Sequence, residues 1–368
     1  MVNTATANSV PVTLLTGYLG AGKTTLLNRI LTHEHGKKVA VIVNEFGDVG
    51  IDHQLIINAD EEIFEMNNGC ICCTIREDLR ETLQLLAAKK RQGLLNFDRV
   101  VIETTGLADP GPVAQTFFMD DEIAGSYLLD SILTLVDAKH AGAQLDTRQE
   151  ARRQVGFADQ IFISKTDLVE PAAVNALMHR LKHMNPRAPQ KAVHFGEVAL
   201  AEVFDLKGFN LNAKLDIDPD FLSADDGHGH GGDKTERKNG HKSEQIAAHG
   251  DDPHHVHDEH CDHPHHHAHD DDVKSFVFRS KRAFNPAKLE DFLGAIVQVY
   301  GPKMLRYKGV LFMKGSDRKV IFQGVHQLMG SDLGPKWAPG EEKSSKMVFI
   351  GIDMPKDVLL QGMEQCLV

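Results

Sequence analysis

"LLTGYLGAGKTTLLNRIL", residues 14–31, is the stretch that decides the fold. From Gly17 to Thr24 it matches G-x-x-x-x-G-K-[ST], whose glycines let backbone N–H groups surround phosphate oxygens. An apolar run precedes the pattern and a helical run follows it, as a phosphate-binding loop requires; the alternative is a glycine-rich turn without a ligand. In such a loop Lys23 neutralises phosphate charge and the Thr24 hydroxyl is a ligand for Mg²⁺. The expected nucleotide-binding residues here are Gly17, Gly20, Ala21, Gly22, Lys23, Thr24 and Thr25.

Short runs rich in Val, Ile and Leu alternate with helical patterns over the first two hundred residues. The predicted strands are residues 12–16, 38–44, 99–103, 131–137 and 160–164. Leu79, Leu83 and Leu86 share one face of a predicted helix over 76–90, and Gly93 is its expected stop. This alternation predicts an α/β domain over residues 1–215, with a doubly wound, mostly parallel sheet.

Two further parts follow this domain. Residues 216–272 are predicted to be a disordered linker, because their His/Asp-rich stretch has almost no apolar side chains to bury. Residues 273–368 are predicted to form a smaller α+β domain with an antiparallel or mixed sheet. Its predicted strands are 273–280, 311–315, 318–325 and 346–354, and its predicted helices are 285–301 and 355–368.

Charge and histidine content are concentrated in residues 224–272. This segment carries 13 acidic and 4 basic side chains, a balance of −9 in a chain of net charge −12, and 13 of the 21 histidines. Imidazoles beside acids predict weak, exchangeable binding of Zn, Ni, Co or Cu, the alternative being a solvated linker without a role. The candidate weak ligands are His254, His255, His257, His260, His263, His265, His266, His267 and His269.

The rest of the chain excludes several classes of function. It is nearly neutral and has no basic stripe, so no nucleic-acid partner is expected. No run approaches the roughly 20 apolar residues that span a bilayer, and the first ten residues do not resemble a secretory signal. A cytoplasmic protein is expected, and in that reducing compartment clustered cysteines serve metal or redox chemistry more often than structural disulfides.

Two more motifs extend the nucleotide site. In "RVVIETTGLADPGP" (99–112) a strand ends at Glu103, which can hold Mg²⁺, and the Gly106 N–H can meet a γ-phosphate; the alternative is a helix-capping acid. In "FISKTDL" (162–168) Lys165 and Asp167 are spaced as in the [NTS]-K-x-D signature, with serine where asparagine is usual. An aspartate there accepts two hydrogen bonds from guanine, which adenine cannot donate; a solvated turn is the alternative. The expected catalytic residues are Lys23, Thr24, Glu103 and Gly106.

Five motifs in one order resemble the CobW-type P-loop GTPases, most of all their YjiA-type members. They are the phosphate-binding loop, "NEFGDVGID" (44–52), "GCICC" (69–73), "ETTG" (103–106) and "SKTD" (164–167). "MLRYKG" (304–309) and "KMVFIGI" (346–352) are similar to the family's C-terminal domain, whereas the long His-rich insertion is a departure in length and position. The resemblance implies slow GTP hydrolysis with Mg²⁺ and a role in handling zinc, cobalt or nickel.

Cys70, Cys72 and Cys73 form the candidate transition-metal site. They precede the predicted helix over 76–90, whose dipole favours thiolates, and thiolates suit Zn²⁺. The resemblance implies Glu45, the acid of "NEFG", as a further ligand. A redox disulfide between adjacent cysteines and three buried small side chains are the alternatives. Cys366 is expected in a core.

The expected function is a metallochaperone that hydrolyses GTP to GDP and transfers Zn²⁺, Co²⁺ or Ni²⁺ to an unidentified client metalloprotein, with a homo-oligomer possible. One alternative is a metal buffer with weak or vestigial nucleotide hydrolysis. Another is a cobalt or nickel insertase, including a role in cobalamin synthesis.

Overall fold

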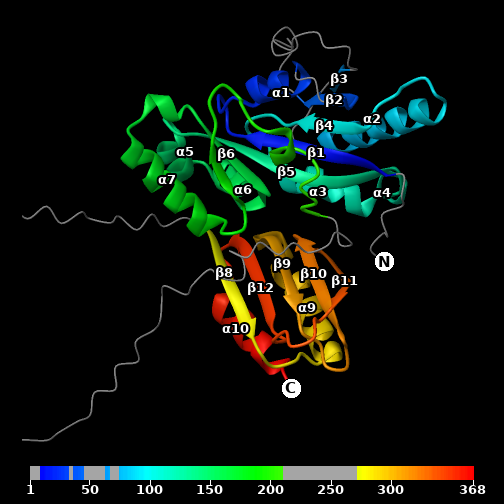
Figure 1. Ribbon diagram of the computed structural model, residues 1–368, viewed down its shortest axis with the longest axis vertical. Helices are drawn as coiled ribbons and strands as arrows, with labels where there is room; N and C mark the ends of the chain where they lie inside the picture. The colour runs from blue at the N-terminus through cyan, green and yellow to red at the C-terminus, as the bar shows by residue number, and fades with distance from the viewer. Residues whose placement is uncertain (1–8, 33–35, 45–62, 67–73, 210–271) are drawn as a thin grey trace, which may run out of the picture. The chain divides into compact units, whose positions relative to one another are not determined.

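The computed structural model describes residues 9–32, 36–44, 63–66, 74–209 and 272–368 (Figure 1). The described residues fall in one compact unit, which joins Met1–Asp216 with Asp271–Val368. The candidate ligands among residues 216–271 lie outside the described residues. No helix in the described part of the chain is both long and apolar enough to cross a membrane.

The first sheet has seven parallel strands. They are β1 (Val10–Gly17), β2 (Val39–Asn44), β3 (Ile63–Met66), β4 (Arg99–Glu103), β5 (Tyr127–Asp137), β6 (Gln160–Ser164) and β7 (Gln190–Ala192). The order is β3-β2-β4-β1-β5-β6-β7, and every neighbouring pair is parallel, so the predicted doubly wound sheet is confirmed. The edge strands β3 and β7 were not predicted, because each has only three or four residues.

Helices cover both faces of this sheet (Figure 1). They are α1 (Lys23–Thr32), α2 (Thr74–Arg91), α3 (Pro110–Met119), α4 (Asp121–Ser126), α5 (Ala141–Thr147), α6 (Gln149–Phe157) and α7 (Pro171–Met184), with short 3₁₀ turns η2 (Thr166–Leu168) and η3 (Leu200–Glu202). Leu79, Leu83 and Leu86 are buried as predicted, and Gly93 follows the end of α2 with φ of +73°. One core packs α1 against the strands through Leu26, Leu27 and Ile30.

The second sheet has five antiparallel strands and two main helices. Its elements are β8 (Val273–Ser280), α9 (Pro286–Tyr300), η4 (Gly301–Lys303), β9 (Met304–Leu311), β10 (Arg318–Val325), β11 (Leu328–Lys336), β12 (Ser345–Ile352) and α10 (Lys356–Gln365). The order is β11-β10-β9-β12-β8, with every ladder antiparallel. Both helices pack on a core that contains Phe349, Leu293 and Met363, together with Cys366, which is buried as expected.

The strand predicted at 311–315 is wrong in position, because the strand runs over Met304–Leu311. Gly309 permits it: a Cβ there would lie 2.4 Å from the Lys346 carbonyl oxygen of β12. Beyond Leu311 the chain leaves the ladder, since the Phe312 amide donates to Ser345 Oγ at 2.8 Å and Gly315 turns with φ of +83°. Phe312 and Met313 therefore follow β9 without extending it, and Met313 forms an isolated bridge with Phe284.

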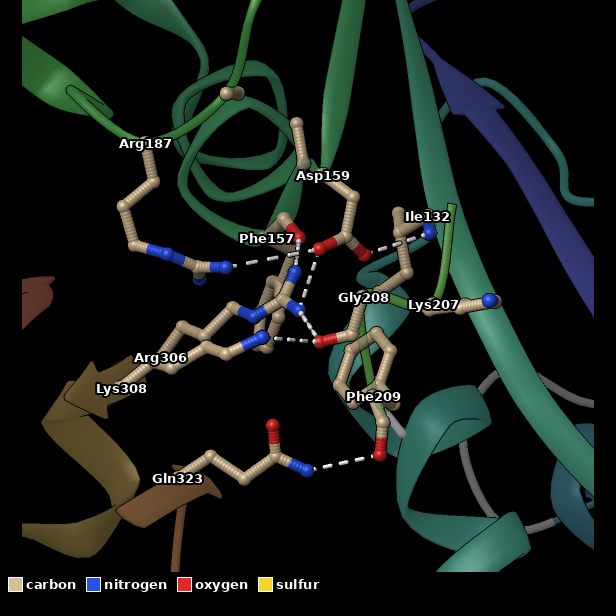
Figure 2. Close-up of polar contacts among 12 residues, drawn as sticks. Ile132, Phe157, Asp159, Arg187, Lys207, Gly208, Phe209, Arg306, Lys308 and Gln323 are labelled. Carbon is tan, nitrogen blue, oxygen red and sulfur yellow. Dashed lines mark hydrogen bonds and ion pairs between the residues drawn. The ribbon is translucent and has the colours of Figure 1, made fainter. Parts of the chain in front are cut away.

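A network centred on Asp159 connects β9 to the first sheet (Figure 2). Arg306, whose side chain is 3% exposed, pairs with Asp159 Oδ1 at 2.6 Å and donates to the carbonyl oxygens of Phe157 at 2.8 Å and Gly208 at 3.0 Å. The other carboxylate oxygen of Asp159 accepts from the Ile132 amide at 3.0 Å. One carboxylate therefore holds the end of α6, strand β5 and strand β9 together.

Candidate nucleotide site

The phosphate-binding loop joins the end of β1 to the start of α1. Gly17 has φ of +146°, and a Cβ there would lie 2.5 Å from the Leu135 carbonyl oxygen, so only glycine fits. Lys23 is buried, and its Nζ donates to the Gly17 carbonyl oxygen at 3.0 Å. The lysine therefore bridges the two ends of the loop, and its ammonium lies among the loop's own peptide groups.

Thr24 and Glu103 meet at the place expected for Mg²⁺. Thr24 Oγ1 donates to Glu103 Oε1 at 3.1 Å, and Glu103 is buried at the end of β4. A hydroxyl and a carboxylate are hard oxygen donors, which Mg²⁺ prefers, and Mg²⁺ usually takes only one or two protein ligands beside phosphates and waters. The two residues therefore fit such an ion, and the pairing brings the two predicted ligands together.

The segment after β4 lies directly against the phosphate-binding loop. A Cβ on Gly106 would lie 2.6 Å from the Leu19 backbone nitrogen, so glycine allows the two backbones to touch. Thr104 adds two ties to β1: its amide donates to the Leu15 carbonyl oxygen at 3.0 Å, and its hydroxyl donates to Thr16 Oγ1 at 3.1 Å. Gly106 is therefore placed beside the loop that is expected to hold the phosphates.

Gln154 in α6 holds this segment and was not predicted from the sequence. It is 1% exposed, and its Nε2 donates to the Gly106 carbonyl oxygen at 3.1 Å and to the Ala108 carbonyl oxygen at 3.0 Å. The preceding residue, Arg153, pairs with Asp109, which caps α3 by accepting from the Gly111 amide at 2.9 Å. In the sequence Gln154 follows two arginines in a helical pattern, which indicates a solvated face rather than a buried contact.

Ser164 and Lys165 attach the base-recognition segment to the phosphate-binding loop. Ser164 Oγ donates to the Ala21 carbonyl oxygen at 2.7 Å. Lys165 has φ of +57°, and its Nζ donates to the Gly20 carbonyl oxygen at 2.8 Å and to Asp137 Oδ2 at 2.7 Å. The serine in place of asparagine therefore keeps a bond between β6 and the loop.

Asp137 is a second residue that sequence reasoning missed, although an acid at the end of a predicted strand is a usable signal. Burial raises the pKa of Asp137, but hydrogen bonds from Lys165 and His140 outweigh it and hold the pKa below its usual value. Asp137 is thus a carboxylate that orients Lys165. Asp167, in η2, is half-exposed, and its Oδ1 lies 3.6 Å from His194 Nδ1.

The predicted transition-metal ligands lie outside the described residues. They are Glu45, Cys70, Cys72, Cys73 and the nine histidines from His254 to His269. Among the residues that the structure describes, no group of three or more His, Cys, Asp or Glu side chains could hold a metal ion. The described site therefore brings together the nucleotide ligands only.

Comparisons with known proteins match both sheets. Residues 11–191 match the family model for the CobW/HypB/UreG nucleotide-binding domain, and residues 273–367 match the model for the C-terminal domain of cobalamin synthesis protein cobW. A protein of Escherichia coli (strain K12) named zinc chaperone YjiA is 37% identical over 352 residues, covering 95% of this chain and 96% of that protein. A protein of Sinorhizobium sp named zinc chaperone CobW is 28% identical, covering 95% of this chain and 96% of that protein.

A solved structure shows the same arrangement. The crystal structure described as Zn(II)-bound YjiA GTPase from E. coli superimposes with a TM-score of 0.72 and 31% identity, and it covers 98% of this chain and 100% of that one. The likeness spans both sheets. From the two matched domains and the near full-length relatives, this chain belongs to the CobW/HypB/UreG family.

Proposed function

We propose that this protein is a GTPase that couples hydrolysis of GTP to GDP with transfer of a transition-metal ion, foremost Zn²⁺, to a client protein. The contact between Thr24 and Glu103 carries the nucleotide half of the proposal, because it joins the two segments that must meet around Mg²⁺ and phosphate. Membership of a family with relatives named zinc chaperones supports the metal half.

The described residues have distinct roles in the reaction. Amides of the loop and the Lys23 ammonium bind the β- and γ-phosphates, while Thr24 and Glu103 hold Mg²⁺, which when bound offsets phosphate charge. The Gly106 N–H donates to the γ-phosphate, and Gln154 fixes the neighbouring carbonyls so that this N–H keeps its direction. After hydrolysis the N–H loses its acceptor, and the segment from Glu103 to Pro110 relaxes.

Guanine selectivity is assigned to Asp167 and metal transfer to the cysteines. The Asp167 carboxylate accepts from the guanine N1–H and exocyclic amine, while Lys165 orders the segment that carries it. Cys70, Cys72 and Cys73, with Glu45, bind the transferred ion, and α2 begins at Thr74, so its positive end favours thiolates there. The client is an unidentified metalloprotein, a homo-oligomer is allowed, and a reducing cytoplasm would keep the thiols available.

Two substitutions separate the halves of this proposal. Lys23→Ala should abolish GTP hydrolysis but keep the tight zinc site, because the phosphate cation and its hydrogen bond to Gly17 both belong to the phosphate-binding loop. Cys72→Ala should keep basal hydrolysis and weaken tight zinc binding by about 100-fold, because the remaining ligands are too few. Any zinc dependence of turnover should also disappear in Cys72→Ala.

Phosphate release assays and zinc titration against a competing chelator measure both outcomes. Cys366→Ala is the matched control, since that cysteine is buried in the second core and should leave zinc affinity unchanged. Wild-type turnover in Lys23→Ala would refute the GTPase assignment. Equal zinc affinity in Cys72→Ala and the wild type would show that the cysteines are not the site.

A further inference from the structure

Two histidine side chains converge on the exposed face of α7. His179 and His183 are one helical turn apart, and both are exposed. Their Nε2 atoms lie 2.9 Å apart, and the rings meet edge to face with centroids 4.4 Å apart. At that distance two neutral imidazoles can share one hydrogen bond, with one Nε2 donating and the other accepting.

The same geometry is close to that of two imidazoles on one metal ion. Metal–nitrogen bonds of about 2.0–2.1 Å in a tetrahedral site place the two nitrogens roughly 3.3 Å apart. Small rotations of the rings of His179 and His183 would open their nitrogens to that distance. Both rings already present Nε2, so one ion could be bound without a change in the helix.

Packing of α7 against the rest of the protein fixes the backbone that carries the pair. Leu177, Leu181 and Met184 are buried on the opposite face of α7. The His183 carbonyl oxygen accepts from Ser275 Oγ of β8 at 2.8 Å, which fixes the last turn. The two imidazoles are thus carried on an ordered backbone, so binding an ion orders little more than two side chains.

The charges around the pair allow a cation. Arg180, which lies between the two histidines in sequence, is engaged with Asp146 at 2.8 Å, and its side chain is only 10% exposed. The pair also lies near the C-terminal end of α7, where the helix dipole favours positive charge. Lys182 is an exposed cationic side chain in the same turn of α7.

We propose that His179 and His183 form a surface site for one divalent transition-metal ion, with Nε2 of each ring as ligand and water in the remaining positions. Two imidazoles suit Zn²⁺, Ni²⁺, Co²⁺ and Cu²⁺, with Cu²⁺ held most tightly. Because only two protein ligands are fixed, the ion exchanges readily. The two histidines are not among the metal ligands proposed above, and the proposal does not depend on GTP hydrolysis.

The test is diethyl pyrocarbonate footprinting of the full-length protein, read by peptide mass spectrometry. Free Zn²⁺ and Ni²⁺ are set by chelator buffers, so the histidines of residues 224–272 cannot deplete the ion. The modification of each imidazole is read separately. We expect His179 and His183 to become protected from modification together as the free metal concentration rises, with one midpoint concentration for both. In His183→Ala the midpoint for His179 should rise about tenfold or more, because the second ligand no longer acts at high effective concentration.

Lys182→Ala is the matched control. It changes an exposed side chain of the same turn without removing an imidazole, so the midpoint should not rise. The proposal is overturned if the metal ions leave both rings reactive while they protect the histidines of residues 254–269. It is equally overturned if His179 is protected at the same midpoint in His183→Ala as in the wild type. Either result would leave the pair as a hydrogen bond between two imidazoles.

Discussion

At the scale of single residues, Ser164 shows how a short hydroxyl takes a position where the base-recognition pattern usually has an amide. Its Oγ lies 2.7 Å from the Ala21 carbonyl oxygen and 3.4 Å from the Val136 carbonyl oxygen. The shorter contact connects β6 to the phosphate-binding loop, so serine at this position still holds the loop by a hydrogen bond. The alternative of a solvated turn for this segment is therefore not needed to explain the serine.

Ser164→Ala should weaken GTP binding about fivefold, because a lost hydrogen bond to a partly buried carbonyl corresponds to about 1 kcal/mol. The loop would remain in place through Lys165, so hydrolysis of bound GTP should change little. Ser164→Thr keeps the hydroxyl and is the control. Calorimetric GTP titration and single-turnover assays measure the two quantities. Equal affinity in Ser164→Ala and the wild type would contradict a binding role for this bond.

Asp167→Asn should exchange the preference for guanine with one for xanthine. The new amide donates to the xanthine C2 carbonyl, whereas the guanine exocyclic amine then faces a second donor and loses its acceptor. We expect GTP affinity to fall by about 100-fold or more and that for xanthosine triphosphate to rise. Competition with a fluorescent nucleotide measures both, and Glu170→Gln is a nearby control. Unchanged GTP affinity in Asp167→Asn would mean that guanine is recognised elsewhere.

At the scale of elements, three consecutive residues of α6 contact two different parts of the molecule. Arg152 pairs with Asp272 at the start of the second sheet, Arg153 pairs with Asp109, and Gln154 holds the segment after β4. A Cβ on Gly156 would lie 2.6 Å from Leu305 Cδ1, so this glycine lets the helix approach β9. The nine-residue helix α6 therefore contacts both the segment after β4 and the second sheet.

Gln154→Met should lower the rate of GTP hydrolysis about tenfold and leave GTP affinity nearly unchanged. Methionine keeps the volume but donates nothing, so the carbonyls of Gly106 and Ala108 lose their shared donor. Phosphate binding depends on other residues, which is why the effect should fall on kcat rather than KM. Gln154→Glu also removes the donors, so it should be at least as slow.

Gln160→Met is the matched control for that experiment. Gln160 is buried at the start of β6, and its Nε2 donates to its own strand, at 3.4 Å to the Ile161 carbonyl oxygen. A similar loss of thermal stability is expected in both variants, but a slower kcat only in Gln154→Met. Parallel decreases of kcat in the two variants would show a general packing effect and would count against a positioning role.

These elements also show what the sequence could and could not predict. β4 and β6 were predicted at their observed bounds because buried parallel strands are continuous apolar runs between helices. The strand over Met304–Leu311 was placed too late, because the close approach at Gly309 depends on β12, which lies far along the chain. The residues of the phosphate-binding loop follow a fixed spacing that a sequence pattern specifies, whereas Gln154 donates to backbone carbonyls that no local pattern specifies.

At the scale of the whole chain, the Asp159 network concentrates positive charge around one carboxylate. Arg306 pairs with Asp159 at 2.6 Å, Arg187 lies 3.9 Å from the same oxygen, and Lys308 donates to the Gly208 carbonyl oxygen at 3.4 Å (Figure 2). Gly208 is required here, because a Cβ would lie 2.3 Å from Asp159 Oδ1. Burial, followed by repulsion from Arg187 and Arg306, lowers the pKa of Lys308 to about 7, although Asp159 acts in the opposite direction.

The depressed pKa of Lys308 predicts that stability rises with pH above neutrality. Below pH 7 the lysine is charged in both the folded and unfolded states, and burying its charge opposes folding. Between about pH 7 and 10.5, the unfolded lysine still holds a proton that the folded one has lost, so the free energy of unfolding increases with pH. Above that window both forms are neutral and the gain is complete. The total is on the order of 5 kcal/mol.

Lys308→Met should remove this rise, since methionine keeps a long apolar chain and carries no proton. Urea unfolding at several values between pH 7 and 10 measures it, and the fluorescence of Trp337, the single tryptophan, reports on the second sheet to which Lys308 belongs. Lys281→Met is the control, because that lysine side chain is 75% exposed and pairs with Glu342 at the surface. We expect the free energy of unfolding of the wild type and of Lys281→Met to increase in parallel as the pH rises. In Lys308→Met it should already be higher at pH 7 and should increase less. The same slope in all three proteins would mean that Lys308 keeps its proton in the folded state, with Asp159 compensating for the two arginines.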